Sequence, residues 1–477
     1  MIRSRSMLAG ALVFGIVPAL GAQLPPPEPP VPRGERATQD PFANVGSDRQ
    51  ADIATVVRTA FFSRSAGHRN RALRFLVDRD RRDVVPAFIA VLRMLPDQDG
   101  RLLNALQRLA RAEIPHDWNA WMEWQEEHTE IRPYRGFESF KADVLAAIDP
   151  NFRDFLYRGV RHDIRVEEIV WGGVKKDGIP ALVNARQIPA ADATYLTDRE
   201  LVFGVSINGD SRAYPLRILD WHEMFNDVVG GVPVSLAYCT LCGSGILYDT
   251  RVPKRRKPFV FGSSGLLYRS NKLMYDTATQ SLWNQFTGRP VVGRLTGSGI
   301  ELKILPVVIA SWQDWLAANP GTTVLSVDTG FQRDYRPGRP YGEYFASPDL
   351  MFPVLVRDRR LAAKDRIFVF RDGKSEMAWA LSLFADNRVI HDRVGSRDVV
   401  LVGNAETETV RAYESEGRTF TAVEGDQFGL ESGGERWTVT EEALAGPDGE
   451  SLIRLPGHVA YWFAWQSYKD GRPLRVE

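Results

Sequence analysis

Two cysteines three positions apart are the most specific chemical signal in this chain of 477 residues. They are Cys239 and Cys242, and Gly243 follows them to complete a C-x-x-C-G segment. In such a turn both sulfur atoms can face one point, and a thiolate pair of this kind is half of a zinc site. His222 lies upstream in the same segment and offers an imidazole as the next ligand. The spacing therefore predicts a transition-metal site with His222, Cys239 and Cys242 as ligands.

Four further side chains could complete such a site. Glu223 and Asp227 follow the histidine closely, and either one could act as a general base or orient the imidazole. A fourth ligand could come from Met274 or His458. Sulfur ligands combined with imidazole suit copper(I) as well as zinc. We therefore expect either a transition-metal carrier or a metalloenzyme with an open coordination position.

The same cysteine pair supports two other functions. A C-x-x-C pair can cycle between dithiol and disulfide, as it does in thiol–disulfide oxidoreductases. It can also form a permanent disulfide that tightens a turn, which an oxidising compartment favours. Two cysteines are too few for a disulfide framework, so the cysteine count does not decide between these functions. The alternatives to a metal site are thus a redox protein and a non-catalytic envelope interaction module.

The first residues have the pattern of a secretory signal peptide. Arg3 and Arg5 form a basic start, and residues 7–20 are an apolar run followed by small residues. This run is shorter than the roughly 20 residues that span a bilayer. We therefore expect cleavage after a signal peptide at about 1–22, export to the periplasm or beyond, and a mature chain not integral to the membrane. Residues 23–50 are rich in proline and predict an extended linker.

A helical module with a basic surface is predicted after the linker. The 60 basic and 60 acidic side chains of the whole chain cancel, which gives no electrostatic case for a nucleic-acid partner. Residues 51–150 carry apolar side chains at helical spacing, as at Leu102, Leu106 and Leu109, and predict a small α-helical module. Residues 51–111 contain twice as many arginines as aspartates and no lysine or glutamate. This basic surface is either a solvated helix face or a docking face for an acidic protein partner.

From about residue 165 the sequence favours strands and turns. Residues 201–207 are a strand-like run, and Asn208 and Gly209 follow them. An Asn-Gly pair supplies the two positive φ angles of a tight hairpin turn, so a hairpin is predicted here. Residues 262–265 place two serines between glycines, which predicts a tight turn between two further strands. The second part of the chain is therefore expected to be β-rich.

The β-rich part repeats itself. Matching positions are Phe203 and Phe368, Tyr214 and Trp379, and Gly230 and Gly395 at an offset of 165, and Trp312 and Trp462, and Trp315 and Trp465 at an offset of 150. We interpret this as an internal duplication with copies at about 200–325 and 366–477. Asn404 and Thr407 stand where the first copy has its cysteines. The predicted fold class is α+β, with a small N-terminal α-helical module followed by a β-rich domain made of two duplicated copies.

Several motifs in the β-rich part occur together in a known family. They are Arg212-Ala-Tyr-Pro-Leu, Trp221-His222-Glu223, Tyr238-Cys239-Thr-Leu-Cys242-Gly, Phe261-Gly-Ser-Ser-Gly-Leu and Tyr461-Trp-Phe-Ala-Trp465. In this order they resemble DUF3179, a domain of unknown function in exported or membrane-associated bacterial and archaeal proteins. The resemblance covers about 165–477 and leaves the helical module outside. The usual family form has proline where this chain has Thr240. The resemblance implies that the His/Cys segment is important, and it implies no activity.

Overall fold

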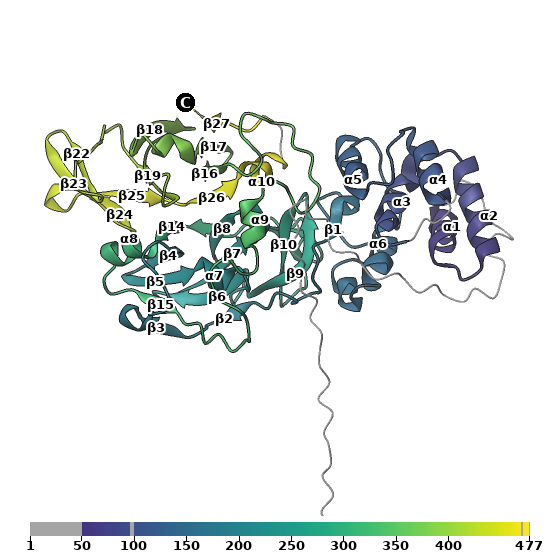
Figure 1. Ribbon diagram of the computed structural model, residues 1–477, viewed down its shortest axis with the longest axis horizontal. Helices are drawn as coiled ribbons and strands as arrows, with labels where there is room; N and C mark the ends of the chain where they lie inside the picture. Colours follow the sequence, from purple (N-terminus) through teal and green to yellow (C-terminus); the bar gives the residue numbers. More distant parts are fainter. Residues whose placement is uncertain (1–49, 96–99, 469–470, 477) are drawn as a thin grey trace, which may run out of the picture.

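The computed structural model describes residues 50–95, 100–468 and 471–476 (Figure 1). The predicted signal peptide and residues 23–49 of the predicted linker lie outside the described residues. Within the described part, no helix is both long enough and apolar enough to cross a bilayer. Helices dominate the beginning of this part and five β-sheets the remainder. The fold is α+β with a β-rich body, as the sequence predicts.

Short helices form the module at the start of the described chain. They are α1 (Gln50–Phe62), α2 (Ala66–Asp78), α3 (Val85–Leu92), α4 (Arg101–Ala110), α5 (Trp118–Glu127) and α6 (Phe137–Ala146). Ser65 caps α2 and Asp117 caps α5, each accepting hydrogen bonds from backbone N–H groups of the first helical turn. The apolar side chains of α4 repeat at helical spacing, and Leu102, Leu106 and Leu109 are all buried. Local spacing therefore explains both the start and the inward face of these helices.

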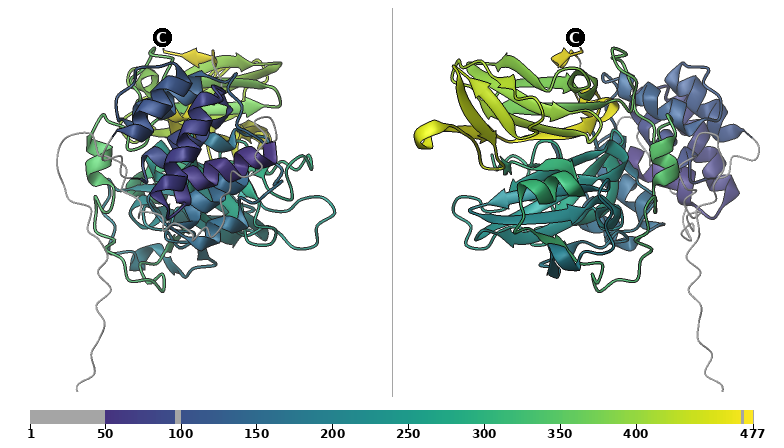
Figure 2. Two further views of the ribbon diagram at one scale, coloured as in Figure 1. Left: turned by 90° about the vertical axis from the view of Figure 1, so that its right-hand side faces the viewer. Right: turned by 60° about the vertical axis from the view of Figure 1, so that its left-hand side comes forward.

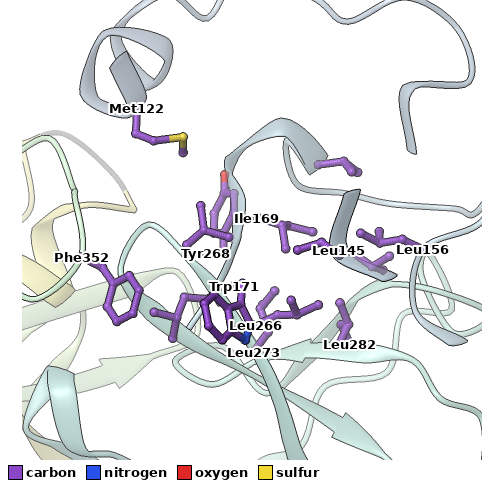
Figure 3. Packing of buried hydrophobic residues seen from close by; sticks show 14 of the residues in the cluster. Met122, Leu145, Leu156, Ile169, Trp171, Leu266, Tyr268, Leu273, Leu282 and Phe352 are labelled. Carbon is purple, nitrogen blue, oxygen red and sulfur yellow. The ribbon is translucent and has the colours of Figure 1, made fainter. Parts of the chain in front are cut away.

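The helical module packs directly on the first sheet of the β-rich body. The strands of this sheet, in spatial order, are β1 (Ile169–Trp171), β9 (Phe261–Tyr268), β10 (Asn271–Asp276), β11 (Leu282–Asn284) and β12 (Arg289–Val292). Met122 and Leu145 from the helices belong to one buried cluster with Leu266 and Leu273 from the strands, and Figure 3 shows part of this cluster. Burying such a side chain stabilises a fold by about 1.5–3 kcal/mol. The module and the sheet therefore share a core.

Four more sheets make up the rest of the body, in a lower pair and an upper pair (Figure 2). The lower pair consists of β13 (Lys303–Leu305), β8 (Ser244–Asp249), β7 (Val232–Cys239), β6 (Met224–Val229) and β2 (Leu182–Val183), and of β14 (Val308–Ser311), β4 (Leu201–Ile207), β5 (Asp210–Pro215), β15 (Thr323–Leu325) and β3 (Gln187–Pro189). The upper pair consists of β26 (Gly457–Tyr461), β16 (Arg366–Asp372), β17 (Ser375–Ala380) and β27 (Leu474–Arg475), and of β18 (Val389–Val394), β19 (Arg397–Asn404), β20 (Thr409–Glu414), β25 (Ser451–Leu455), β24 (Ala443–Ala445), β23 (Glu435–Val439), β22 (Gly429–Ser432) and β21 (Thr421–Ala422). One buried cluster extends through both pairs and includes Phe203 and Leu236 below and Phe368 and Leu401 above.

The lower and upper pairs have matching strand order and register. The order β14-β4-β5-β15 corresponds to β26-β16-β17-β27, and β15 is parallel to β5 as β27 is parallel to β17. Corresponding cross-strand pairs are Phe203–Tyr214 and Phe368–Trp379, Leu236–Leu247 and Leu401–Ala412, and Val324–Ala213 and Leu474–Ala378. These pairs are the positions that the sequence offsets of 165 and 150 relate. The backbone pairing of β4–β8 and β13–β15 therefore recurs in β16–β20 and β25–β27.

Short helices connect or follow the strands of the body. They are α7 (Leu216–Leu219), α8 (Trp312–Ala318), α9 (Gly342–Ala346) and α10 (Trp462–Gln466). The hairpin predicted at Asn208 and Gly209 is confirmed, because β4 and β5 pair in antiparallel fashion on either side of these residues. Their φ angles of 51° and 78° have the positive sign that such a turn requires.

The tight turn predicted at residues 262–265 is wrong, because these residues lie inside β9. The glycines serve close packing instead. A Cβ atom on Gly262 would lie 2.6 Å from a ring carbon of Tyr275, and one on Gly265 would lie 2.5 Å from the carbonyl oxygen of Val174. Glycine in a strand often marks such a close approach, which a turn signal alone does not distinguish.

Candidate functional site

The two cysteines form a disulfide at the turn that connects β7 and β8. Cys239 ends β7 and pairs with Ser244, the first residue of β8. Residues 240–242 form one turn of 3-10 helix, and Gly243 has a φ of 56°. This turn brings the Cα atoms of Cys239 and Cys242 to 5.2 Å, within the usual range for a disulfide. The cysteines are only 2% and 0% exposed, so the disulfide is buried.

Three distant segments cover this turn. The ring of Tyr461 lies against Gly243, where an added Cβ atom would meet it at 3.0 Å. The hydroxyl of Tyr344, in α9, donates a hydrogen bond to the carbonyl oxygen of Leu241 at 2.7 Å. The carbonyl oxygen of Ser270, in the connection between β9 and β10, lies 3.5 Å from the sulfur of Cys242. The surroundings of the disulfide therefore come from both halves of the body and from α9.

A buried ion pair lies next to the same turn. The hydroxyl of Thr240 donates to Oε1 of Glu223 at 3.3 Å. Oε2 of Glu223 accepts from Nζ of Lys272, which lies 3.4 Å from the hydroxyl of Ser263. The side chains of Lys272 and Glu223 are only 4% and 11% exposed. Burial lowers the pKa of Lys272, whereas the charge of Glu223 opposes that shift. The carboxylate is the main counter-charge of this lysine.

A second carboxyl group, that of Asp220, is buried close to this pair. Burial raises the pKa of Asp220 to about 8, a hydrogen bond from Tyr238 opposes the shift, and the charge of Glu223 raises it further. Its Oδ1 atom has no hydrogen-bond partner within the described part of the chain. At neutral pH this carboxyl group is therefore largely protonated. Asp220 and Glu223 form a pair of interacting carboxyl groups, one of which holds a proton.

Both ring nitrogens of His222 have partners other than the cysteines. Its Nδ1 atom lies 2.8 Å from the carbonyl oxygen of Pro180, and its Nε2 atom lies 2.6 Å from the hydroxyl of Tyr335. Because a carbonyl oxygen can only accept, Nδ1 carries the proton and Nε2 accepts from the tyrosine. Burial lowers the pKa of His222 to about 4, so the imidazole is neutral. Glu223 has a φ of 54°, and this local turn directs the two neighbouring side chains to different partners.

Asp227 links two strands and does not join the ion pair at the turn. Its Oδ2 atom accepts from Nη1 of Arg212 at 2.7 Å and from the hydroxyl of Tyr214 at 2.9 Å, which ties β6 to β5. The corresponding residue of the upper sheets, Asp392, accepts from Nε1 of Trp379 at 2.9 Å. The same contact thus occurs where no cysteine is present, which indicates a structural role for Asp227.

The predicted metal ligands are not brought together as a set. Met274 is buried in β10, and His458 lies in β26, 5.7 Å from the ring of Phe286. Among the residues that the structure describes, no group of three or more His, Cys, Asp and Glu side chains is placed to hold a metal ion. The zinc or copper site with His222, Cys239 and Cys242 stays a prediction. It requires the reduced cysteines, because a thiolate is the form that binds metal.

Comparison with known proteins gives one match. The family described as a protein of unknown function, DUF3179, matches residues 176–471. The chain belongs to the DUF3179 family. No curated protein and no solved structure matches this chain. The DUF3179 match begins after the six helices of the module and contains the disulfide, Asp220 and the Glu223–Lys272 pair.

Three residues of the DUF3179 part contribute to the site although the sequence motifs did not single them out. The sequence around Lys272 indicates a buried ion pair, because a lysine beside the apolar residues Leu273 and Met274 is unusual unless it is paired. The position of Asp220 is also a signal of burial, because this residue closely follows the apolar residues of α7. Nothing in the sequence identified Leu241 as the partner of Tyr344, since their hydrogen bond joins positions 103 residues apart.

Proposed function

We propose that this protein is a thiol–disulfide redox protein whose Cys239 and Cys242 cycle between disulfide and dithiol. The observation that carries this proposal is the buried Glu223–Lys272 pair, which is hydrogen-bonded to the residue between the cysteines. Reduction of a buried disulfide delivers two electrons and two protons to a site with little access to water. A purely structural disulfide needs no ionisable groups beside it, and burying such groups is unfavourable.

The proposed reaction exchanges a disulfide with a partner dithiol. A thiolate of the partner attacks one sulfur atom, which forms a mixed disulfide and releases the other cysteine as a thiolate. The second thiol of the partner, as its thiolate, then attacks the mixed disulfide, and the partner leaves as a disulfide. The partner has lost two electrons and two protons, and both cysteines end as thiols. The reverse reaction oxidises the dithiol pair and reduces a partner disulfide.

The surrounding groups suit the proton transfers of this cycle. Asp220, which interacts with Tyr238 and Glu223, is largely protonated near neutral pH and is the proposed proton donor for a thiolate released at this turn. The ammonium group of Lys272 adds positive charge, which favours a thiolate over a thiol. The carbonyl oxygen of Ser270 can accept a hydrogen bond from the reduced Cys242 thiol. These two charged or titratable groups and the Ser270 contact are the features that support exchange at this pair.

Burial of the sulfur atoms means that a partner must first displace what covers them. We propose that the segment at residues 341–347 is the movable part of this cover. Its helix, α9, has only five residues and is fixed by Nζ of Lys364, which donates to the carbonyl oxygens of Tyr344 and Ser347 at 2.6 and 2.8 Å. The hydrogen bond from Tyr344 to Leu241 is its direct link to the cysteine turn. Opening this part of the cover therefore requires breaking that hydrogen bond and withdrawing the buried ring of Tyr344.

We also infer that the β-rich body arose by internal duplication and that only the first copy carries redox chemistry. The matching strand order and register support the duplication. The hydrogen bonds of Asp227 and Asp392 to aromatic partners at corresponding positions support it further. Asn404 and Thr407 replace the cysteines at the equivalent turn of the second copy.

Export of the protein and docking through its helical module complete the proposal. The basic and apolar start of the sequence supports cleavage at about residue 22 and a periplasmic or extracellular location. A C-x-x-C disulfide fits the oxidising conditions found there. The arginine-rich helices are the proposed docking face for an acidic protein partner.

Equilibration of the purified protein with a dithiothreitol redox buffer tests the central proposal. Thiol labelling followed by mass spectrometry measures the reduced fraction, and circular dichroism reports whether the fold persists. We expect a reversible two-electron transition with the fold intact, and a larger reduced fraction in Glu223→Gln, because the positive charge of Lys272 is then uncompensated and favours the thiolate. Glu406→Gln is the matched control, because this exposed acid lies in the equivalent turn of the second copy. A disulfide that is reduced only when the protein unfolds would show that it is structural.

A further inference from the structure

A second polar cluster lies where α10 meets β16 and β26 (Figure 1). We call it the α10 cluster, and it consists of Arg371, His458, Trp465 and Arg472. His458 stands opposite Val369 in the paired strands, and Arg371 lies two positions farther along the same strand. Side chains two positions apart share a face of a sheet, so Arg371 and His458 project to the same side.

The α10 cluster is assembled around one indole ring. The guanidinium carbons of Arg472 and Arg371 lie 3.9 and 6.0 Å from the centre of the Trp465 ring. The His458 ring lies 6.1 Å from the same ring. Phe286 packs 5.7 Å from His458 and 5.8 Å from Trp465, which excludes water from one side. The side chains of Arg371, His458 and Arg472 thus surround the Trp465 ring, and the indole N–H of Trp465 is a further donor.

Each member of the cluster has a buried nitrogen atom without a partner. These atoms are Nε1 of Trp465, Nε2 of His458 and the Nε atoms of Arg371 and Arg472, and none has a hydrogen bond within the described part of the chain. Trp465 and His458 are only 1% and 3% exposed. More than 90% of buried polar groups in proteins are hydrogen-bonded, because an unsatisfied buried group destabilises the fold. Four exceptions around one ring indicate a missing acceptor.

The charges of the cluster specify the kind of acceptor. Burial, and then the charges of Arg371 and Arg472, lower the pKa of His458 well below its usual range, so the imidazole is neutral. Arg472 forms an ion pair with Glu376 at 2.9 Å, whereas Arg371 donates to the carbonyl oxygen of Phe286. One carboxylate against two guanidinium groups leaves a positive charge in a mostly buried place. An anion would offset this charge and supply acceptor oxygens.

We propose that the α10 cluster is a binding site for a tetrahedral oxyanion, a phosphate or sulfate group that is either free or part of a larger molecule. Guanidinium groups bind such anions through paired N–H donors. The indole N–H and the imidazole of His458, in its Nε2–H form, come from other elements, and an anion with four oxygens can accept from all of them. A carboxylate, with two oxygens in one plane, matches fewer of these donors. This site is separate from the redox proposal and does not depend on it.

Binding of sodium phosphate and sodium sulfate to the full protein tests the proposal by titration calorimetry and thermal unfolding. Sodium chloride at equal ionic strength is the reference, sodium acetate represents a carboxylate, and glycerol 3-phosphate represents a phosphate carried on a larger molecule. We expect saturable binding and a higher Tm with phosphate or sulfate, and weaker binding of acetate. Tighter binding of glycerol 3-phosphate than of free phosphate would assign the site to a phosphorylated molecule, and equal binding would assign it to the free anion.

Two variants identify the cluster as the site. Trp465→Phe keeps an aromatic ring but removes the indole N–H, and Arg371→Gln removes one charge. Since a hydrogen bond to a charged group contributes about 1.5–3 kcal/mol, we expect each change to weaken binding about tenfold or more. Arg359→Gln removes an exposed arginine outside the cluster and should bind as the parent does. The proposal is wrong if phosphate and sulfate act no differently from chloride, if acetate binds equally well, or if the two variants retain the parent affinity.

Discussion

The hydroxyl of Thr240 donates a hydrogen bond to the carboxylate of Glu223 at 3.3 Å, and both residues are buried. This contact joins the turn between the two cysteines to the ion pair with Lys272. A proline at this position would have no hydroxyl to donate. The link between the disulfide turn and the buried charges therefore depends on the threonine that this chain carries.

Removing one charge of the buried pair should destabilise the protein strongly. We expect Glu223→Gln or Lys272→Met alone to lower the free energy of unfolding by about 3–5 kcal/mol, because the remaining charge is left without its partner. The double variant should lose less than the sum of the two. Urea unfolding of the parent, both single variants and the double variant measures this difference, and additive losses would contradict the predicted coupling.

The stability of the protein should fall between about pH 4 and pH 8 through Asp220. Burial raises the pKa of this carboxyl group from 3.8 to about 8 in the folded state, so the folded protein holds a proton that the unfolded chain releases. Stability therefore decreases as the pH rises through this window. The substitution Asp220→Asn removes this pH dependence. The free energy of unfolding of the variant should therefore rise relative to that of the parent as the pH increases. Urea unfolding at pH 5, 7 and 9 checks this trend, and a difference that stays constant with pH would contradict it.

Loss of the Tyr344 hydroxyl should expose the cysteine turn. Tyr344→Phe removes the hydrogen bond to Leu241 and should cost about 1 kcal/mol of stability. We expect reduction by dithiothreitol under native conditions to become several-fold faster, because α9 is held less firmly over the turn. Tyr157→Phe is the control, because it changes an exposed tyrosine that is distant in sequence from Tyr344 and from the cysteine turn. An unchanged reduction rate would mean that the cover does not control access.

Metal binding by the reduced protein should not depend on His222. Each ring nitrogen of His222 already has a hydrogen-bond partner, Nδ1 with Pro180 and Nε2 with Tyr335. A metal could therefore bind either nitrogen only after a rearrangement. We expect His222→Ala to leave the zinc or copper content of the reduced protein unchanged, as measured by elemental analysis. Cys239→Ser is the comparison, since it removes a thiolate. Stoichiometric metal that both substitutions abolish would instead establish the three-ligand site predicted from the sequence.

Local sequence patterns determined the elements of the fold. Asn208 and Gly209 determined a hairpin turn, because their positive φ angles suit few other residues. The positions of tryptophans and glycines at constant offsets anticipated two matching sets of strands, and the cysteine spacing identified the turn that now holds a disulfide. Such features depend on residues within a few positions of each other or on repeated patterns, so they can be recognised without three-dimensional information.

Tertiary structure alone decided which side chains share a site. His222 and Glu223 are neighbours in sequence, yet one is bonded to Pro180 and Tyr335 and the other to Thr240 and Lys272. The Glu223–Lys272 contact spans 49 positions, and the sequence carries no rule that relates residues so far apart. Their meeting depends on how β10 packs beside β7, and packing is determined by the whole set of side chains that fill the core.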